Sequence, residues 1–235
     1  MTVFLRLLLA HFLADFVLHR QKLFELKSNK PFLGYGLHGL TFFIVAVALC
    51  FDYLHLPWLD FGVFALNGWV MLALASLLHG AFDMLNSSDR MKSERYNTVL
   101  FVLWQTVEIS LLFLIFPYVP SSPLHFNNFL IILNGALFVA YFIMVLLHYL
   151  RVDIATEDCN PAFEESYAAM LYRIILYFLV LAPGFWGYGL GAAWVGFCAY
   201  TKGGGIIDVN PRCFWTGTVL TFLTALIVRL FFYYL

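Results

Sequence analysis

The chain has 235 residues, of which 63% are hydrophobic and only 11% are charged, against about 45–50% and about 25% in soluble domains. A water-soluble domain of this size needs more polar side chains to cover its surface, and a disordered chain needs more still. The net charge of -1 and the absence of any Lys/Arg run exclude a nucleic-acid binder of the usual basic kind. The composition therefore predicts a polytopic membrane protein.

Apolar stretches long enough to cross a bilayer as a helix, about 20 residues, recur along the chain. They predict an all-α polytopic fold with seven or eight transmembrane helices. The count is seven or eight because only a short Pro- and Gly-containing segment separates the sixth expected helix from the seventh, so these two could be one broken helix. The expected helices cover residues 2–18, 32–53, 61–86, 97–118, 127–150, 167–183, 187–201 and 213–234. We expect a repeat-containing bundle over residues 1–118 and further membrane helices over 119–235 that pack on it.

Basic residues gather on alternate loops between the expected helices. Ten of the 13 lie there: Arg20, Lys22, Lys27, Lys30, Arg90, Lys92, Arg95, Arg151, Lys202 and Arg212. The opposite loops, near 54–60, 119–126 and 184–187, hold none. Basic loops stay in the cytoplasm, so we expect the chain in a cell's inner membrane with both termini outside the cytoplasm.

Two of the expected helices, the first and the third, end in the same pattern, His-x-x-x-Asp. Each pattern is followed by a short basic loop and a returning helix with further polar positions. The two sets are His11, Asp15 and His38, and then His79, Asp83, Gln105 and Glu108. The matched spacing predicts two parallel helical-hairpin repeats, related by an axis along the membrane normal.

These polar residues are expected to meet inside the bundle. A spacing of four puts each His and Asp on one helix face, and the rise of about 1.5 Å per residue puts all of them at one cytoplasmic depth. Ionisable groups at that depth are costly if they face lipid, so they must face the bundle interior and need a partner there. A divalent metal is a suitable partner, because imidazole and carboxylate ligands together bind Zn, Mn or Fe. We predict a divalent metal site with the ligands His11, Asp15, His38, His79 and Asp83, and with Glu108 as general base beside Gln105.

Three basic residues are candidates for contacting an anionic substrate or lipid headgroup. Lys22 and Lys27 lie in the first basic loop beside the predicted metal site, and Arg173 lies about one turn inside the sixth expected helix. Positive-inside anchoring also explains the two lysines. Snorkelling, or pairing with a buried carboxylate, also explains the arginine.

At these positions the first half of the sequence resembles the bacterial inner-membrane family of unknown function DUF3307. The pattern of that family is matched by His11, Asp15 and Phe16, by Lys22 and Lys27, by His38, and by His79 and Asp83. The fourth helix departs from the family's Asp-Gln-x-x-His, because it carries Trp104, Gln105 and Glu108. Glutamate at the last position keeps a metal ligand, whereas tryptophan at the first does not. The resemblance implies an inner-membrane location and no particular reaction.

Three functions fit the sequence. The first is a metal-dependent hydrolase acting on a lipid or lipid-linked substrate, and the pattern also looks similar to that of membrane-bound hydrolases with repeated intramembrane histidines. The second is a transporter or channel for divalent cations or protons. The third is a non-catalytic membrane subunit. Membrane lipids are the expected partners, nucleic acid is not, and a second copy of the chain or a cytoplasmic protein stays open.

Overall fold

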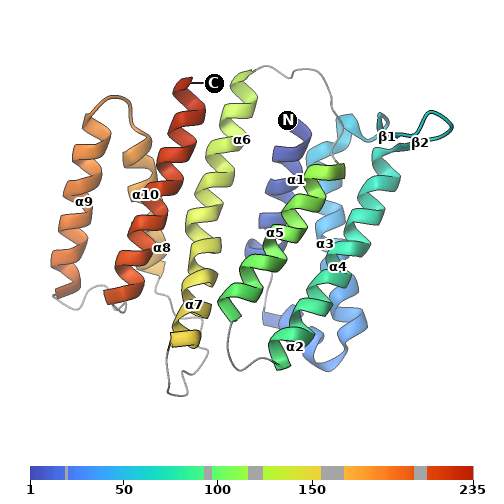
Figure 1. Cartoon of the computed structure of the whole chain (residues 1–235), viewed down its shortest axis with the longest axis horizontal. Coiled ribbons are helices and arrows are strands. Elements are labelled where there is room, and N and C mark those ends of the chain that lie inside the picture. The colour runs from blue at the N-terminus through green and yellow to red at the C-terminus, as the bar shows by residue number, and fades with distance from the viewer. Residues whose placement is uncertain (19–20, 93–96, 116–123, 155–166, 204–210, 235) are drawn as a thin grey trace. The chain divides into compact units, whose positions relative to one another are not determined.

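The computed structural model describes residues 1–18, 21–92, 97–115, 124–154, 167–203 and 211–234, and nearly all of them are helical (Figure 1). This confirms the all-α class. The chain divides into two compact units, Met1–Leu130 and Ile131–Leu235. The boundary expected between residues 118 and 119 lies outside the described residues.

The first unit contains the helices that carry the predicted metal site. They are α1 (Thr2–Phe12) with its π-helical continuation η1 (Leu13–Val17), α2 (Gln21–Asn29), α3 (Pro31–Cys50), α4 (Gly68–Lys92) and α5 (Asn97–Ile115). A short 3-10 turn, η2 (Phe51–Tyr53), and an antiparallel hairpin of β1 (Pro57–Asp60) and β2 (Ala65–Asn67) join α3 to α4. The next helix, α6 (Leu124–Leu137), runs from the first unit into the second.

The second unit continues from α6 into the π-helix η3 (Phe138–Phe142) and α7 (Ile143–Ile154). It is completed by α8 (Tyr167–Leu181), α9 (Trp186–Gly203) and α10 (Pro211–Tyr234). The turn between α8 and α9 contains Gly184 with a φ of +69°, a left-handed conformation that glycine adopts without strain. The sixth and seventh expected helices are therefore two separate helices and not one broken helix.

Among the described residues, five helical segments are long and apolar enough to cross a membrane. They are Pro31–Tyr53, Gly68–Asn86, Asn97–Ile115, Asn127–Asp153 and Pro211–Phe231, and Tyr167–Leu181 is a shorter apolar helix. These segments fit a multi-pass membrane protein. The count of seven or eight spans, the parallel repeats, the inner membrane and the orientation of the termini stay predictions.

Two segments differ from the expected elements. The third helix was expected from residue 61, but it begins at Gly68 and is preceded by the β1–β2 hairpin. The hairpin turns because the Asp60 carboxylate accepts from the backbone N–H of Gly62, whose φ is +76°. The first basic loop also contains a helix, α2, which packs so closely on α3 that a Cβ on Gly34 would lie 2.6 Å from the backbone of Lys27.

The apolar core of the first unit fills the end of the bundle nearest the hairpin. Its buried side chains come from α1, α3, α4 and α5 and include Val3, Leu7, Phe42, Ala46, Leu72, Ala75 and Leu112. The polar cluster lies next to this core, since His38 and His79 are about 17 Å along their helices from the hairpin end, at 1.5 Å per residue.

Candidate metal centre

The helices α3 and α4 cross at two glycines, each directly after a histidine of the polar cluster. A Cβ on Gly39 would lie 2.6 Å from the carbonyl oxygen of Ser76, and one on Gly80 would lie 2.8 Å from a carbonyl oxygen of α3. Only glycine permits backbones to approach this closely. As a consequence, the ring centroids of His38 and His79 are 4.8 Å apart.

Asp15 enters the cluster from a π-helix. The N–H of Leu18 donates to the carbonyl of Leu13, five residues earlier, at 2.8 Å, so this turn is wider than an α-helical turn. Such single π-helical turns occur often at functional sites. The Asp15 carboxylate lies between the two neighbouring helices, with Oδ1 at 3.0 Å from Nε2 of His79 and at 3.2 Å from Nε2 of His38.

Gln105 fixes which nitrogen of His11 carries a proton. The Gln105 amide nitrogen is 3.5 Å from Asp15 Oδ2, to which it donates, so its amide oxygen faces His11 Nε2 at 3.2 Å. A carboxylate only accepts and an amide oxygen only accepts. His11 Nε2 therefore donates to the Gln105 oxygen, and in the neutral form of the ring Nδ1 is the nitrogen that is available to bind a metal.

The Nδ1 atom of His11 faces two carboxylates. Nδ1 lies 3.7 Å from Asp15 Oδ2 and 3.7 Å from Glu108 Oε2, and Glu108 Oε2 lies 3.3 Å from Nδ1 of His79. One ligand atom from each of these four residues lies within 4.8 Å of every other. Two atoms bound to one ion at about 2.1 Å in tetrahedral geometry are about 3.4 Å apart. The set can therefore surround a metal ion after small side-chain shifts.

Three buried atoms of this group lack a well-aligned hydrogen bond: Asp15 Oδ1, His79 Nε2 and Glu108 Oε2. The first two approach to 3.0 Å, but this contact lacks the direction of a hydrogen bond. Buried polar atoms are nearly always paired in proteins. A cation between these atoms satisfies them, so the donor set fits a metal.

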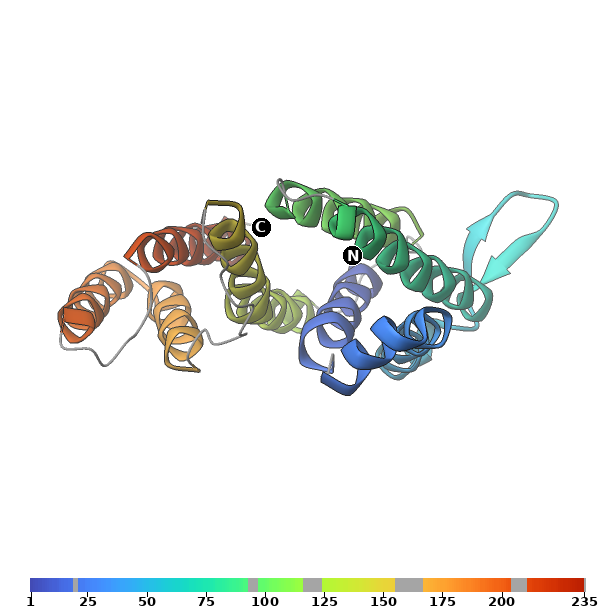
Figure 2. The same cartoon turned by 90° about the horizontal axis from the view of Figure 1, so that it is seen from below.

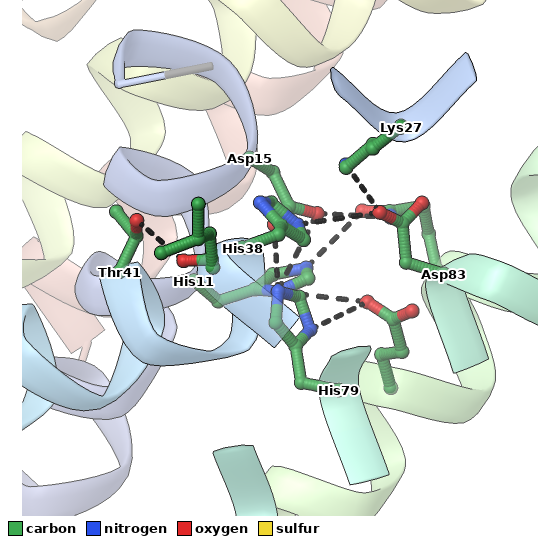
Figure 3. Close-up of polar contacts among 10 residues, drawn as sticks. His11, Asp15, Lys27, His38, Thr41, His79 and Asp83 are labelled. Atoms are coloured by element: carbon green, nitrogen blue, oxygen red, sulfur yellow. Dashed lines mark hydrogen bonds and ion pairs between the residues drawn. The ribbon is translucent and has the colours of Figure 1, made fainter. Parts of the chain in front are cut away.

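The charges of the cluster fit a divalent ion. Three carboxylates meet here, those of Asp15, Asp83 and Glu108, and one ammonium group, that of Lys27, which lies 2.5 Å from Asp83 Oδ2. Figure 3 shows Lys27 reaching Asp83 from α2. Neutral imidazoles, which are the form that binds a metal, would leave the group with a charge of minus two. Because uncompensated charge is costly at membrane depth, a divalent cation is the matching partner.

The cluster is least covered at the end near α2. The Asp15 and Asp83 side chains are 13% and 18% exposed, whereas those of His11 and Glu108 are 1% and 5% exposed. Lys27 from α2 lies at this end, and its ammonium is 5.3 Å from the centre of the Tyr35 ring. A ligand or substrate would approach from here.

The comparison with protein families covers this whole site. A family model described as "Protein of unknown function (DUF3307)" matches residues 3–132, which is more than half of the chain and includes every residue of the cluster. The chain belongs to this family. No curated protein and no solved structure matches it. Membership in DUF3307 supplies no reaction, so the chemistry has to be argued from the site.

The structure brings together eight of the ten residues singled out in the sequence. They are His11, Asp15, Lys27, His38, His79, Asp83, Gln105 and Glu108. Their metal-binding and catalytic roles stay predictions. The four residues whose donor atoms come close enough to share an ion are His11, Asp15, His79 and Glu108. This group differs from the expected ligand set, because it includes Glu108 and leaves out His38 and Asp83. The His38 ring lies 3.2 Å from Asp15 and 3.6 Å from Asp83 and so holds both carboxylates.

The two remaining residues lie elsewhere. The side chain of Lys22 is outside the described residues. Arg173 belongs to the second unit, where it is buried and donates to the carbonyls of Val139 and Ala140 in η3, at 3.0 and 3.3 Å. Neither contact was expected from the sequence.

The fourth-helix departure from the DUF3307 pattern has a simple structural result. Trp104 is half-buried and lies against Phe82, with ring centroids 5.9 Å apart. Glu108, one helical turn further along, lies within the ligand group. The two glycines beside His38 and His79 were missed in the sequence, although the repeated His-Gly dipeptide could have shown them.

Proposed function

We propose that this protein is a divalent-metal-dependent hydrolase of the membrane. His11, Asp15 and His79 hold the ion, and Glu108 lies beside it as general base. The observation that carries the proposal is that one donor atom from each of these four residues lies within 4.8 Å of every other. Two histidines and one carboxylate leave a position open, as catalytic sites do.

The second nitrogen of each histidine also supports this assignment. Metal-binding histidines usually donate their other N–H to a carboxylate or an amide oxygen. His11 donates to the amide oxygen of Gln105. His79 has one nitrogen 3.0 Å from Asp15 and the other 3.3 Å from Glu108, so either nitrogen can bind while the other faces a carboxylate.

A divalent ion in this position supplies Lewis-acid activation of water and of a carbonyl or phosphoryl oxygen. Glu108 is positioned to accept the proton of the attacking water, because its Oε2 has no aligned donor. The substrate class follows from the location. His38, His79 and Glu108 lie within helices long enough to cross a membrane, so a lipid or a lipid-linked molecule is the substrate that reaches the cluster.

The surroundings of the cluster favour a one-sided site over a transport path. Between the cluster and the hairpin end, most buried residues of the bundle are apolar, among them Leu7, Phe42 and Leu72. The buried hydroxyls described there, those of Thr2 and Ser76, donate to protein oxygens. A path for cations or protons needs polar groups or water along its length. This core supports catalysis at one face.

Metal content tests the first half of the proposal. Elemental analysis of the purified full-length protein should find about one Zn, Mn or Fe per chain. His11→Ala and His79→Ala should lose it, while His55→Ala, at an exposed position, should keep it. A folded wild-type protein that holds no metal, and whose melting temperature responds to neither chelator nor added metal, would overturn the site.

Glu108→Gln tests the second half. The variant should keep the metal and lose hydrolysis of phospholipid esters or phosphodiesters in mixed micelles, and chelator should abolish the same activity in the wild type. A metal-loaded wild type that cleaves neither bond class, or a Glu108→Gln variant with wild-type activity, contradicts a hydrolase and leaves the metal site standing.

A further inference from the structure

The β1–β2 hairpin ends in an apolar tip. Its four residues are Phe61, Gly62, Val63 and Phe64. The side chains of Phe61, Val63 and Phe64 are 55%, 94% and 58% exposed. Turns that face water are usually built from Asn, Asp, Ser, Gly and Pro, so this tip has the composition of a surface that something apolar covers.

The tip is held in one conformation. The N–H of Phe61 donates to the carbonyl of Phe64 at 3.1 Å, and the Asp60 carboxylate accepts from the N–H of Gly62 at 2.8 Å. The two phenylalanine rings are paired, with centroids 5.0 Å apart. Val63 stands alone at the turn. The exposure is thus a property of an ordered turn.

The base of the hairpin is fixed to the bundle. Trp58 is buried, and its indole N–H donates to the carbonyl of Tyr53 at 2.9 Å. A Cβ on Gly68 would lie 2.7 Å from the backbone of Leu54, so the chain re-enters the bundle in close contact with the segment that left it. The direction of the hairpin is therefore set by the helices.

That direction is sideways. Figures 1 and 2 show the hairpin leaving the ends of α3 and α4 across the helix axes and extending beyond the helices of its unit. It joins two segments that are long enough to span a membrane, Pro31–Tyr53 and Gly68–Asn86. The hairpin begins where one span ends, and it leads into the start of the next span. Because it also runs across the axes of both helices, it stays at the level of the membrane surface.

We propose that the tip Phe61–Phe64 is an anchor inserted into the lipid at the membrane–water boundary. Aromatic and aliphatic side chains on a preformed turn suit the boundary between headgroups and acyl chains. The segment 54–67 contains no Lys or Arg, so the lipid surface it fits is neutral and the insertion is independent of ionic strength. The anchor fixes the depth of the α3–α4 pair, and it does not depend on the metal or on hydrolysis.

A probe at the most exposed position tests the anchor. Val63→Cys, labelled with an environment-sensitive NBD fluorophore, is reconstituted as the full chain into neutral phosphatidylcholine vesicles. The parent protein, labelled in parallel, gives the background from the natural cysteines, and Asp52→Cys, also exposed and at the same end of α3, is the matched control. Because the Val63 side chain is 94% exposed, its replacement leaves the packing of the unit unchanged.

The expected result is a blue-shifted emission at residue 63 compared with residue 52. Lipids with a nitroxide near the headgroup should quench residue 63 more strongly than lipids with a deep nitroxide, iodide in the water should quench it weakly, and high salt should change neither result. Strong quenching by iodide with none by lipid nitroxides overturns the proposal. So does a blue shift that no nitroxide lipid quenches and that dilution of the protein in the vesicles reverses, because that result indicates a second copy of the chain on the tip.

Discussion

The amide oxygen of Gln105 lies 3.2 Å from Nε2 of His11, so Nδ1 is the nitrogen of that ring that faces the other ligand residues. The two residues are 94 positions apart in sequence and belong to α1 and α5. Gln105 touches none of the other histidines in the described contacts, yet it decides which atom of His11 is offered to the centre. It is a positioning residue.

Replacing Gln105 by leucine should weaken metal binding while the fold is retained. Leucine keeps the volume but removes the acceptor for His11 and the donor to Asp15, so the ring can take either tautomer. Loss of such an outer partner typically lowers metal affinity about 10–100-fold. Competition with a chelating dye in detergent measures the change. Thr106→Val, one residue away and exposed, is the control, and wild-type affinity in Gln105→Leu would contradict the tautomer argument.

The glycine crossing predicts a loss of affinity without the loss of any ligand. Gly39→Ala places a methyl group 2.6 Å from the Ser76 carbonyl oxygen, so α3 and α4 must separate, and the His38 and His79 rings move apart. We expect a lower melting temperature and weaker metal binding. Gly36→Ala is the matched control, because a Cβ there meets nothing within 4 Å. It should be neutral or stabilising by about 0.5–1 kcal/mol, and equal behaviour of the two variants would refute the crossing.

The positions of the histidines and carboxylates were predictable because helical spacing and membrane cost act on each residue separately. His11, Asp15 and His79 had to face the interior wherever the helices lay. The contacts between them were not predictable, since they depend on a π-turn at Asp15 and on a helix crossing at Gly39. Both are results of packing between helices, which periodicity along one helix does not contain.

The hairpin was missed for a different reason. Residues 61–66 are apolar apart from Gly62, and they precede a long apolar helix. In a membrane protein, hydrophobic runs lack the polar alternation that separates strand from helix. The turn depends on Asp60 accepting from Gly62 and on the positive φ of that glycine. These local hydrogen bonds overrule the apolar pattern.

Lys27 should control the affinity for cations through charge. Lys27→Met removes the ammonium that lies 2.5 Å from Asp83, so the metal-free protein keeps an uncompensated carboxylate and should lose about 1–3 kcal/mol of stability. A divalent ion then replaces the missing positive charge. We expect the melting temperature to be lower without metal and its rise on adding metal to be larger than in the wild type. Lys27→Arg keeps the charge and is the control. A metal-induced rise no larger than in the wild type would show that Lys27 has no part in the charge balance.

Arg173 should stabilise the second unit and leave the metal alone. Its guanidinium donates to the Val139 and Ala140 carbonyls in η3, where the π-helical turn alters the hydrogen bonding of the backbone. Arg173→Met leaves these buried carbonyls without these donors, at a cost of about 1–3 kcal/mol for each group left unpaired. Arg173→Lys should recover only part, since one ammonium replaces a planar fork of donors. Arg151→Met, at an exposed position of α7, is the control in the same unfolding titration.

The same three variants should keep the metal content of the wild type, because the ligand group lies wholly within the first unit. Loss of metal in a folded Arg173→Met protein would place Arg173 in the metal site.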